Sequence, residues 1–237
     1  MDDEKLNLKE ATDSNLQTTE TIGKNHEHEL KLDEFLGWMI ALLFPFTAVG
    51  LMNVTGVPLL SALIYYGVFG IYLRIKMTGR LPYFKPQLSK VKVETLLLIF
   101  SGGLCGYLYL LAEPNFQPLT TGLLLNLFVF TLLNGTFEHL VWVNIYELAG
   151  KRKKYLGVIA STIYVSLIHT CFWLHFLPTG NIENIVLFVA AQLLIFYIPL
   201  RIYVKTNDLT LWSLQHILYN SLTVLFGGFS LWIFLGM

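Results

Sequence analysis

Seven apolar stretches follow one another along the chain, and nearly all charged residues lie before or between them. The hydrocarbon core of a bilayer needs about 20 apolar residues per helix, and most of the stretches approach or exceed that length. The pattern predicts an all-α protein, a polytopic membrane helical bundle with about seven transmembrane helices (six to eight). The predicted spans are Phe35–Val54, Val57–Leu73, Thr95–Ala112, Leu119–Leu148, Tyr155–Leu177, Ile185–Leu200 and Leu211–Met237.

The first 34 residues differ in composition from the rest of the chain. They hold ten of the sixteen acids and four of the sixteen bases, and they are rich in Asn, Thr, Glu and Lys. Such polar, charged segments bury too little apolar surface to fold alone. No basic segment followed by an apolar one precedes the first span, so we expect no secretory signal peptide. The predicted organisation is an acidic, disordered tail over residues 1–34 and a transmembrane domain over residues 35–237.

Composition supports a membrane location. The chain is 54% hydrophobic and 14% charged, whereas soluble domains carry about 25% charged residues. The net charge is zero, which gives no argument for nucleic-acid binding. Membrane lipid is therefore the first expected partner.

The basic residues predict an orientation. All twelve Lys and Arg residues beyond the tail fall in the loops after the second, fourth and sixth spans, and the intervening loops contain none. Basic loops are retained on the cytoplasmic side of a membrane. Seven spans with a cytoplasmic N-terminus satisfy this alternation at every loop.

Two acids lie inside the predicted spans. Glu147 lies four residues before Lys151, so we expect the two to pair at the cytoplasmic interface. Glu138 lies thirteen residues before Lys151, roughly 20 Å deeper along a helix. An ionisable group at that depth costs at least ~2.5 kcal/mol unless it has partners or water. Glu138 is thus a candidate functional residue, against the simpler interpretation of a helix–helix hydrogen bond.

Histidines in three other positions fall at similar predicted depth. His139 follows Glu138 directly, and His169 lies in the fifth predicted span, fifteen residues after Lys154. His216 opens the last span, and Asn220 follows it by four residues, so these two share a helical face. We therefore expect Glu138, His169 and His216 to approach one another from three helices.

This set of side chains can support hydrolysis. A carboxylate beside an imidazole can hold and deprotonate a water, and a second histidine with an amide can donate hydrogen bonds to an oxyanion. The same groups could instead hold a divalent metal such as zinc, with Glu138, His169, His216 and His139 as candidate ligands. The chain has no His-Glu-x-x-His helix, and no cofactor is required by the first interpretation.

Three short motifs carry a family resemblance over residues 95–237. Glu138-His-Leu-Val-Trp-Val-Asn144, Ser161-Thr-Ile-Tyr-Val-Ser-Leu-Ile-His169 and His216-Ile-Leu-Tyr-Asn220 follow in the order and spacing of the CPBP family. These are the CAAX-protease and bacteriocin-processing membrane proteins. The resemblance implies an intramembrane endopeptidase of the bacterial cell membrane that acts on a peptide or lipidated peptide. It implies that Glu138 and His169 activate water, and that His216 and Asn220 form an oxyanion site.

The first motif departs from the family pattern at two positions. Where the family has a second Glu, this chain has His139, and where the family has Arg, it has Val143. The joint loss is consistent with a compensated pair, because removing one charge alone would strand the other. It is equally consistent with a divergent member of altered specificity, or with a non-catalytic relative that acts in bacteriocin self-immunity or as a membrane scaffold. A small proton-coupled transporter that uses Glu138 as a relay is the third hypothesis.

Overall fold

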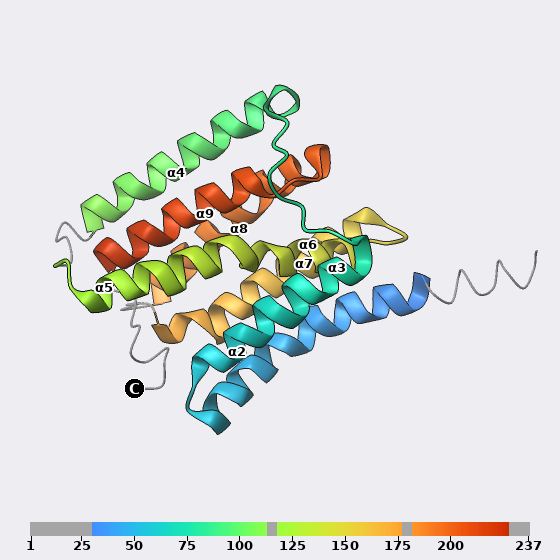
Figure 1. Cartoon of the computed structure of the whole chain (residues 1–237), viewed down its shortest axis with the longest axis horizontal. Coiled ribbons are helices and arrows are strands. Elements are labelled where there is room, and N and C mark those ends of the chain that lie inside the picture. The colour runs from blue at the N-terminus through green and yellow to red at the C-terminus, as the bar shows by residue number, and fades with distance from the viewer. Residues whose placement is uncertain (1–29, 113–117, 177–181, 228–237) are drawn as a thin grey trace, which may run out of the picture.

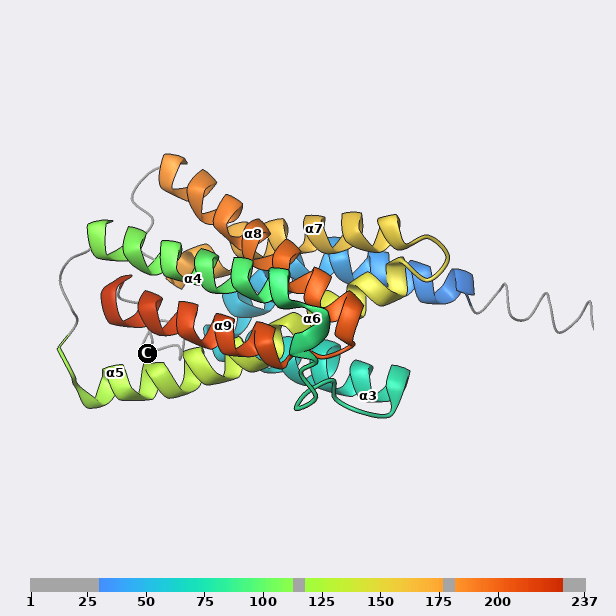
Figure 2. The same cartoon turned by 90° about the horizontal axis from the view of Figure 1, so that it is seen from above.

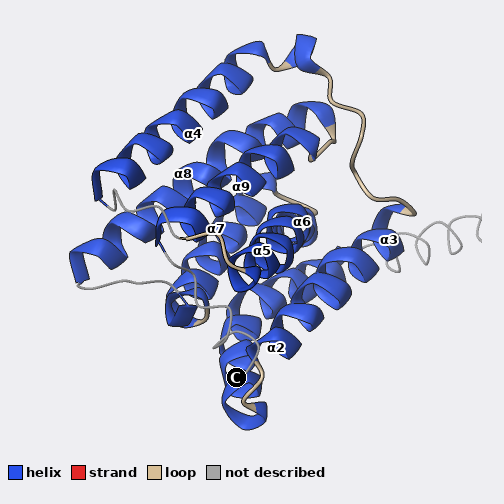
Figure 3. Ribbon diagram, turned by 60° about the vertical axis from the view of Figure 1, so that its left-hand side comes forward, coloured by secondary structure: helices blue, strands red, loops and turns tan. Residues whose placement is uncertain are grey.

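The structure, a computed structural model of the chain, describes residues 30–112, 118–176 and 182–227. In these residues the backbone forms helices joined by turns and loops, without a strand (Figure 3). The predicted all-α class is confirmed. The first helix is present from Leu30, five residues before the first predicted span. Most of the predicted disordered tail, residues 1–29, lies outside the described residues.

The described helices follow the order of the predicted spans, and several consist of consecutive segments (Figure 1). After the helix Leu30–Thr55 come α2 (Pro58–Ile64), the π-helix η1 (Tyr65–Tyr72) and α3 (Leu73–Thr78), then the 3-10 turn η2 (Leu88–Lys90) and α4 (Lys92–Ala112). The next are α5 (Thr121–Asn126), the π-helix η3 (Leu127–Asn134) and α6 (Gly135–Ala149), followed by α7 (Lys154–Cys171) and the 3-10 turn η4 (Trp173–Phe176). The last are α8 (Ile182–Thr206), α9 (Thr210–Leu222) and the π-helix η5 (Thr223–Gly227).

Four of the helices in the described parts of the chain are long and apolar enough to cross a membrane. They are Leu30–Thr55, Pro58–Thr78, Thr121–Ala149 and Lys154–Phe176. Many large apolar side chains on their outer surfaces are exposed, among them Phe46, Leu63 and Phe128. A soluble protein would cover or replace such side chains, whereas lipid tails solvate them. These helices indicate a helical membrane protein.

The helix α6 forms the centre of the bundle. Twelve of its fifteen residues are buried, and it packs against α7, α9 and η1. The crossing with α7 is close, since a Cβ atom on Gly157 would collide with the carbonyl oxygen of Tyr146. The helix α4 lies at one edge of the bundle and packs on α8 and α9 (Figures 1 and 2). Side chains of α6 therefore meet partners from several helices at once.

Ion pairs gather at one end of the bundle. Glu34 at the start of the first helix pairs with Arg152, and its neighbour Asp33 lies 3.1 Å from the ammonium of Lys151. Lys205 near the end of α8 donates to Glu94 on α4 at 2.5 Å. The first helix begins, and the three basic loops lie, at this same end (Figure 1).

The expected pairing of Glu147 with Lys151 is wrong. The Nη1 atom of Arg74, a 2% exposed side chain on α3, donates to Glu147 at 2.7 Å. Tyr203 on α8 also donates to Glu147 and accepts from Arg74 at 2.6 Å. A neighbouring helix thus supplies a fully desolvated guanidinium, which binds the carboxylate in place of the exposed lysine one turn away. This contact joins α3, α6 and α8.

Candidate functional site

The carboxylate of Glu138 lies in the middle of the bundle with no exposed surface. Its Oε1 atom accepts from the indole N–H of Trp173 at 2.8 Å and from the hydroxyl of Tyr65 at 3.4 Å. Its Oε2 atom lies 3.0 Å from Nε2 of His216. These donors come from three separate segments, namely η1, η4 and α9. A buried carboxylate needs such donors because an unpaired one costs far more than a neutral polar group.

His169 approaches the same carboxylate without a direct hydrogen bond. Its Nε2 atom lies 3.9 Å from Oε1 of Glu138, and its Nδ1 atom lies 2.7 Å from the carbonyl oxygen of Val165. Because a carbonyl only accepts, Nδ1 carries a proton. In a neutral ring, Nε2 is then the nitrogen that carries no proton, and it faces an oxygen that also accepts hydrogen bonds. A proton donor between the two, or an imidazolium, makes this approach favourable.

His216 reaches Glu138 because α6 and α9 cross closely. A Cβ atom on Gly135 would lie 2.6 Å from Cγ1 and 2.9 Å from Cα of Ile217. Gly135 precedes Glu138 by one helical turn, and Ile217 follows His216 directly. The absence of a side chain at Gly135 therefore sets the distance between the carboxylate and the imidazole. Since an ionised carboxylate only accepts, His216 donates from Nε2.

His139 lies behind His216 rather than against Glu138. Its ring stacks on Trp212, with centroids 5.0 Å apart and an angle of 12° between the planes. It meets His216 edge to face at 5.0 Å, and its Nε2 atom lies 3.2 Å from the hydroxyl of Ser213. His139 therefore contacts the ring of His216 and helps to fix its position.

Val143 stands where the family motif has an arginine, and its apolar side chain is fully buried. No guanidinium therefore enters the bundle at that position. Arg74 is a buried arginine on another helix, but its partner Glu147 lies nine residues beyond Glu138. The Arg74–Glu147 pair therefore lies toward the charged end of the bundle and does not replace the arginine of the family motif.

Asn220 is 2% exposed, and its Nδ2 atom has no hydrogen-bond partner in the described part of the chain. The same holds for Nδ1 of His216, one turn earlier on α9. Each uncommitted buried polar atom costs about 1–3 kcal/mol. Such atoms are rare in folded proteins and call for an explanation. Both lie on the helical face that carries the Glu138 contact.

The sequence interpretation missed Tyr65 and Trp173. Trp173 follows His169 by four residues, a spacing that places two side chains on one helical face, so its proximity could have been inferred. Tyr65 belongs to a predicted span, Val57–Leu73, that contains no charged residue. Its hydroxyl also accepts from the indole N–H of Trp142 at 3.0 Å, which forms a chain of hydrogen bonds from Trp142 through Tyr65 to Glu138.

Two of the site's segments contain π-helical turns. Tyr65 and Tyr66 open η1, and the hydroxyl of Tyr66 donates to Oδ1 of Asn134 at the end of η3 at 2.7 Å. On the other side of η1, the amide of Asn144 donates to the carbonyls of Phe69 and Gly70 at 2.8 and 2.9 Å. The i→i+5 hydrogen bonds of π-helices widen a helix and occur frequently at functional sites.

The fit of these residues to a metal ion is poor. No group of three or more His, Cys, Asp or Glu side chains within residues 30–112, 118–176 and 182–227 is arranged to hold one. Around Glu138, the indole of Trp173 occupies one carboxylate oxygen and His216 the other. The metal set of Glu138, His169, His216 and His139 predicted from the sequence gains no support.

Comparison with protein-family models, with curated proteins and with solved structures finds no match to this chain. The CPBP resemblance therefore stays a prediction that rests on the three sequence motifs.

Proposed function

We propose that this protein is an intramembrane endopeptidase that hydrolyses a peptide bond of a membrane-associated peptide or lipidated peptide. One observation carries the proposal. Glu138, which is wholly buried, has imidazoles from two other helical segments at 3.0 and 3.9 Å. Catalytic sites gather ionisable side chains in this way.

In the proposed reaction, a water held between Glu138 and Nε2 of His169 attacks the carbonyl carbon of the substrate. Glu138 takes a proton from that water as general base. The tetrahedral intermediate then collapses, the C–N bond breaks, and the proton passes to the leaving amine. The geometry supports this role, because Nε2 of His169 lies 3.9 Å from Oε1 of Glu138, a separation that one bound water can bridge by donating a hydrogen bond to each atom.

The oxyanion of the intermediate needs donors that are not already engaged. His216 uses Nε2 to hold Glu138, so we assign it first to orienting the carboxylate. The amide of Asn220 has an uncommitted N–H group on the same face and is the better candidate for the oxyanion. Such donors in water-poor sites contribute about 3 kcal/mol to transition-state stabilisation.

A non-catalytic role is the second candidate, and the saturation of Glu138 favours it. Tyr65, Trp173 and His216 already donate to the carboxylate, so it can also serve as the polar centre of a membrane scaffold or immunity protein. The proposed enzyme must open between its helices to admit a peptide, whereas a scaffold need not.

Proteoliposomes that hold the purified protein and a mixture of prenylated and leader-type membrane peptides test the two functions. We expect cleavage products, detected by mass spectrometry, from the wild type and from His175→Gln, which alters an exposed histidine. We expect none from Glu138→Gln or His169→Gln, and undiminished cleavage in the presence of a chelator. Equal product from all four proteins would contradict the assignment of these residues. If the wild type gives no product and Glu138→Gln still binds the partner proteins of the wild type, the non-catalytic scaffold function is supported.

We also propose that about seven helices cross the membrane, with the N-terminus and the three basic loops in the cytoplasm. The gathering of ion pairs at one end of the bundle supports this orientation, as does the basic-loop pattern. Cysteines at exposed positions 119 and 153, in a chain with Cys105 and Cys171 replaced by Ala, provide the test. In intact cells an impermeant maleimide should label Leu119→Cys and spare Lys153→Cys, and the reverse result would contradict the orientation.

A further inference from the structure

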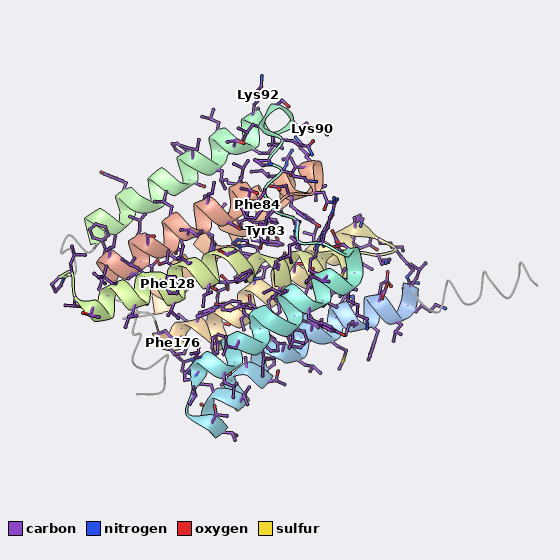
Figure 4. The ribbon with its side chains drawn as sticks, viewed as in Figure 1. Tyr83, Phe84, Lys90, Lys92, Phe128 and Phe176 are labelled. Carbon is purple, nitrogen blue, oxygen red and sulfur yellow. The ribbon has the colours of Figure 1, made fainter. Side chains whose placement is uncertain are left out.

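The loop Gly79–Val91, between α3 and α4, presents an aromatic side chain outward. Phe84 is 89% exposed. Its φ angle is +66°, in the left-handed region that bulky side chains rarely adopt. Strained backbone of this kind persists only where the surrounding structure enforces it, and it is frequently linked to function. Figure 4 labels Tyr83 and Phe84 on this loop, with Lys90 and Lys92 where it joins α4.

Hydrogen bonds from the turn between α8 and α9 hold the strained segment in place. The N–H of Phe84 donates to the hydroxyl of Thr210 at 2.7 Å, and that of Lys85 donates to Oδ2 of Asp208 at 2.8 Å. The N–H of Leu209 donates in return to the carbonyl of Pro82 at 2.7 Å. The exposed position of Phe84 is thus enforced by the fold and does not result from a loose loop.

The surface around Phe84 is positively charged. Four exposed basic residues belong to the loop and the start of α4, namely Arg80, Lys85, Lys90 and Lys92. Residues 79–93 contain no acid. The neighbouring carboxylates are already engaged, since Glu94 pairs with Lys205 and Asp208 accepts from two backbone N–H groups. These four charges therefore lack compensation within their own segment.

We propose that the loop Gly79–Val91 binds anionic phospholipid at the surface of the membrane that holds the helices, with Phe84 inserted at the level of the headgroups. Aromatic rings favour that level, and basic side chains next to membrane helices bind anionic lipid with about 1 kcal/mol each. The loop continues directly into α4, where Val93, Leu96 and Phe100 are exposed apolar side chains. The patch is thus continuous with a surface suited to lipid tails.

Photo-crosslinking in nanodiscs tests this site. The photoreactive residue p-benzoylphenylalanine replaces Phe84 in one variant and Leu96 in the other, in discs of mixed phosphatidylcholine and phosphatidylglycerol. We expect phospholipid adducts at both positions. At Leu96 their composition should match the bulk mixture, whereas at Phe84 phosphatidylglycerol should be enriched several-fold. The triple change Lys85→Gln, Lys90→Gln and Lys92→Gln should abolish that enrichment.

Two results would overturn the proposal. One is the absence of lipid adducts at Phe84 while Leu96 reacts, which would place the ring in water. The other is a set of lipid adducts at Phe84 with the bulk lipid ratio, which would show that the patch contacts lipid without selectivity. If Phe84 instead crosslinks to a second polypeptide in native membranes, the patch binds a protein partner and the proposal also fails. The substituted residues Phe84, Leu96 and the three lysines are all exposed, so none of these substitutions removes a packed side chain from the bundle.

Discussion

The Nε2 atom of His216 lies 3.0 Å from Oε2 of Glu138, although 78 residues separate the two in the chain. The contact joins the central helix α6 to α9, and the two side chains are 2% and 0% exposed. This hydrogen bond contributes to the stability of the bundle, because a wholly buried carboxylate that loses a donor is left incompletely paired.

We first predict that His216→Ala destabilises the protein by about 1–3 kcal/mol. The loss should appear as unfolding at a lower fraction of denaturing detergent in mixed micelles. The matched control is His175→Ala, since His175 is exposed and its Nδ1 atom lies against a backbone carbonyl, that of Phe172, and not against a carboxylate. Equal midpoints for the two variants would show that the Glu138–His216 contact does not stabilise the fold.

A second prediction concerns the close crossing of α6 and α9. Gly135→Ala places a methyl group against the backbone of Ile217, and we expect a loss of about 1–3 kcal/mol with weaker assembly of the candidate site. Gly102→Ala is the control, because a Cβ atom there meets nothing within 4 Å. That control should be neutral or slightly stabilising, since alanine is the better helix former. A neutral Gly135→Ala would mean that the helices separate without cost.

The partner of Glu147 can be identified by a double-mutant cycle. Arg74→Met should cost about 3 kcal/mol, because it leaves Glu147 without its buried partner. Adding Glu147→Gln should recover part of that loss. Lys151→Ala should stay within about 0.5 kcal/mol, as for most surface substitutions. A large effect of Lys151→Ala, additive with the effect of Arg74→Met, would restore the pairing expected from the sequence.

The Glu94–Lys205 pair predicts a dependence of stability on pH. The hydrogen bond from Lys205 lowers the pKa of the Glu94 carboxyl below its ordinary value. The pair therefore stabilises the fold above the pKa that Glu94 has in the unfolded chain, and this contribution is lost as the pH falls through the lower folded pKa. Between neutral pH and about pH 3, the wild type should lose more thermal stability than Glu94→Gln. If the melting temperatures of the two proteins fall in parallel as the pH is lowered, the pair does not stabilise the fold.

The strain at Phe84 predicts that removing the side chain stabilises the protein in detergent. Phe84→Gly should raise the free energy of unfolding by up to about 1 kcal/mol, because glycine adopts a positive φ angle without steric cost. Gly79→Ala is the opposite control, since Gly79 has a φ angle of +70° at the end of α3. This variant should lose a similar amount of stability, because alanine adopts a positive φ angle only with strain. A destabilised Phe84→Gly would show that the ring packs against the fold.

The helical architecture could be predicted because each span has to be apolar along most of its length, whatever it packs against. The depth of Glu138, His169 and His216 followed from the same regularity, since a helix rises about 1.5 Å per residue. The contacts of Glu147 did not follow. A rule based on local spacing favoured Lys151, whereas the observed partner, Arg74, lies 73 residues away on α3.

The other donors to Glu138 were beyond the sequence for a related reason. Tyr65 and Trp173 look like ordinary aromatic residues of membrane helices, and their polar atoms matter only once η1 and η4 pack against α6. The π-helical turns of η1 and η3 have no simple sequence signal. The distance of 3.0 Å between His216 and Glu138 depends on Gly135, whose importance appears only when Ile217 lies against it.

The three donors to Glu138 also impose an order on biosynthesis. Tyr65 precedes Glu138 by 73 residues, whereas Trp173 and His216 follow it by 35 and 78. Chains are made from the N-terminus, so the ribosome finishes α6 well before two of the partners of its carboxyl group exist. A nascent chain that stops before α9 therefore carries an incompletely paired acid in its central helix. Docking of α9 completes that pairing, so a helix made 78 residues after the acid decides when the polar centre of the bundle is finished.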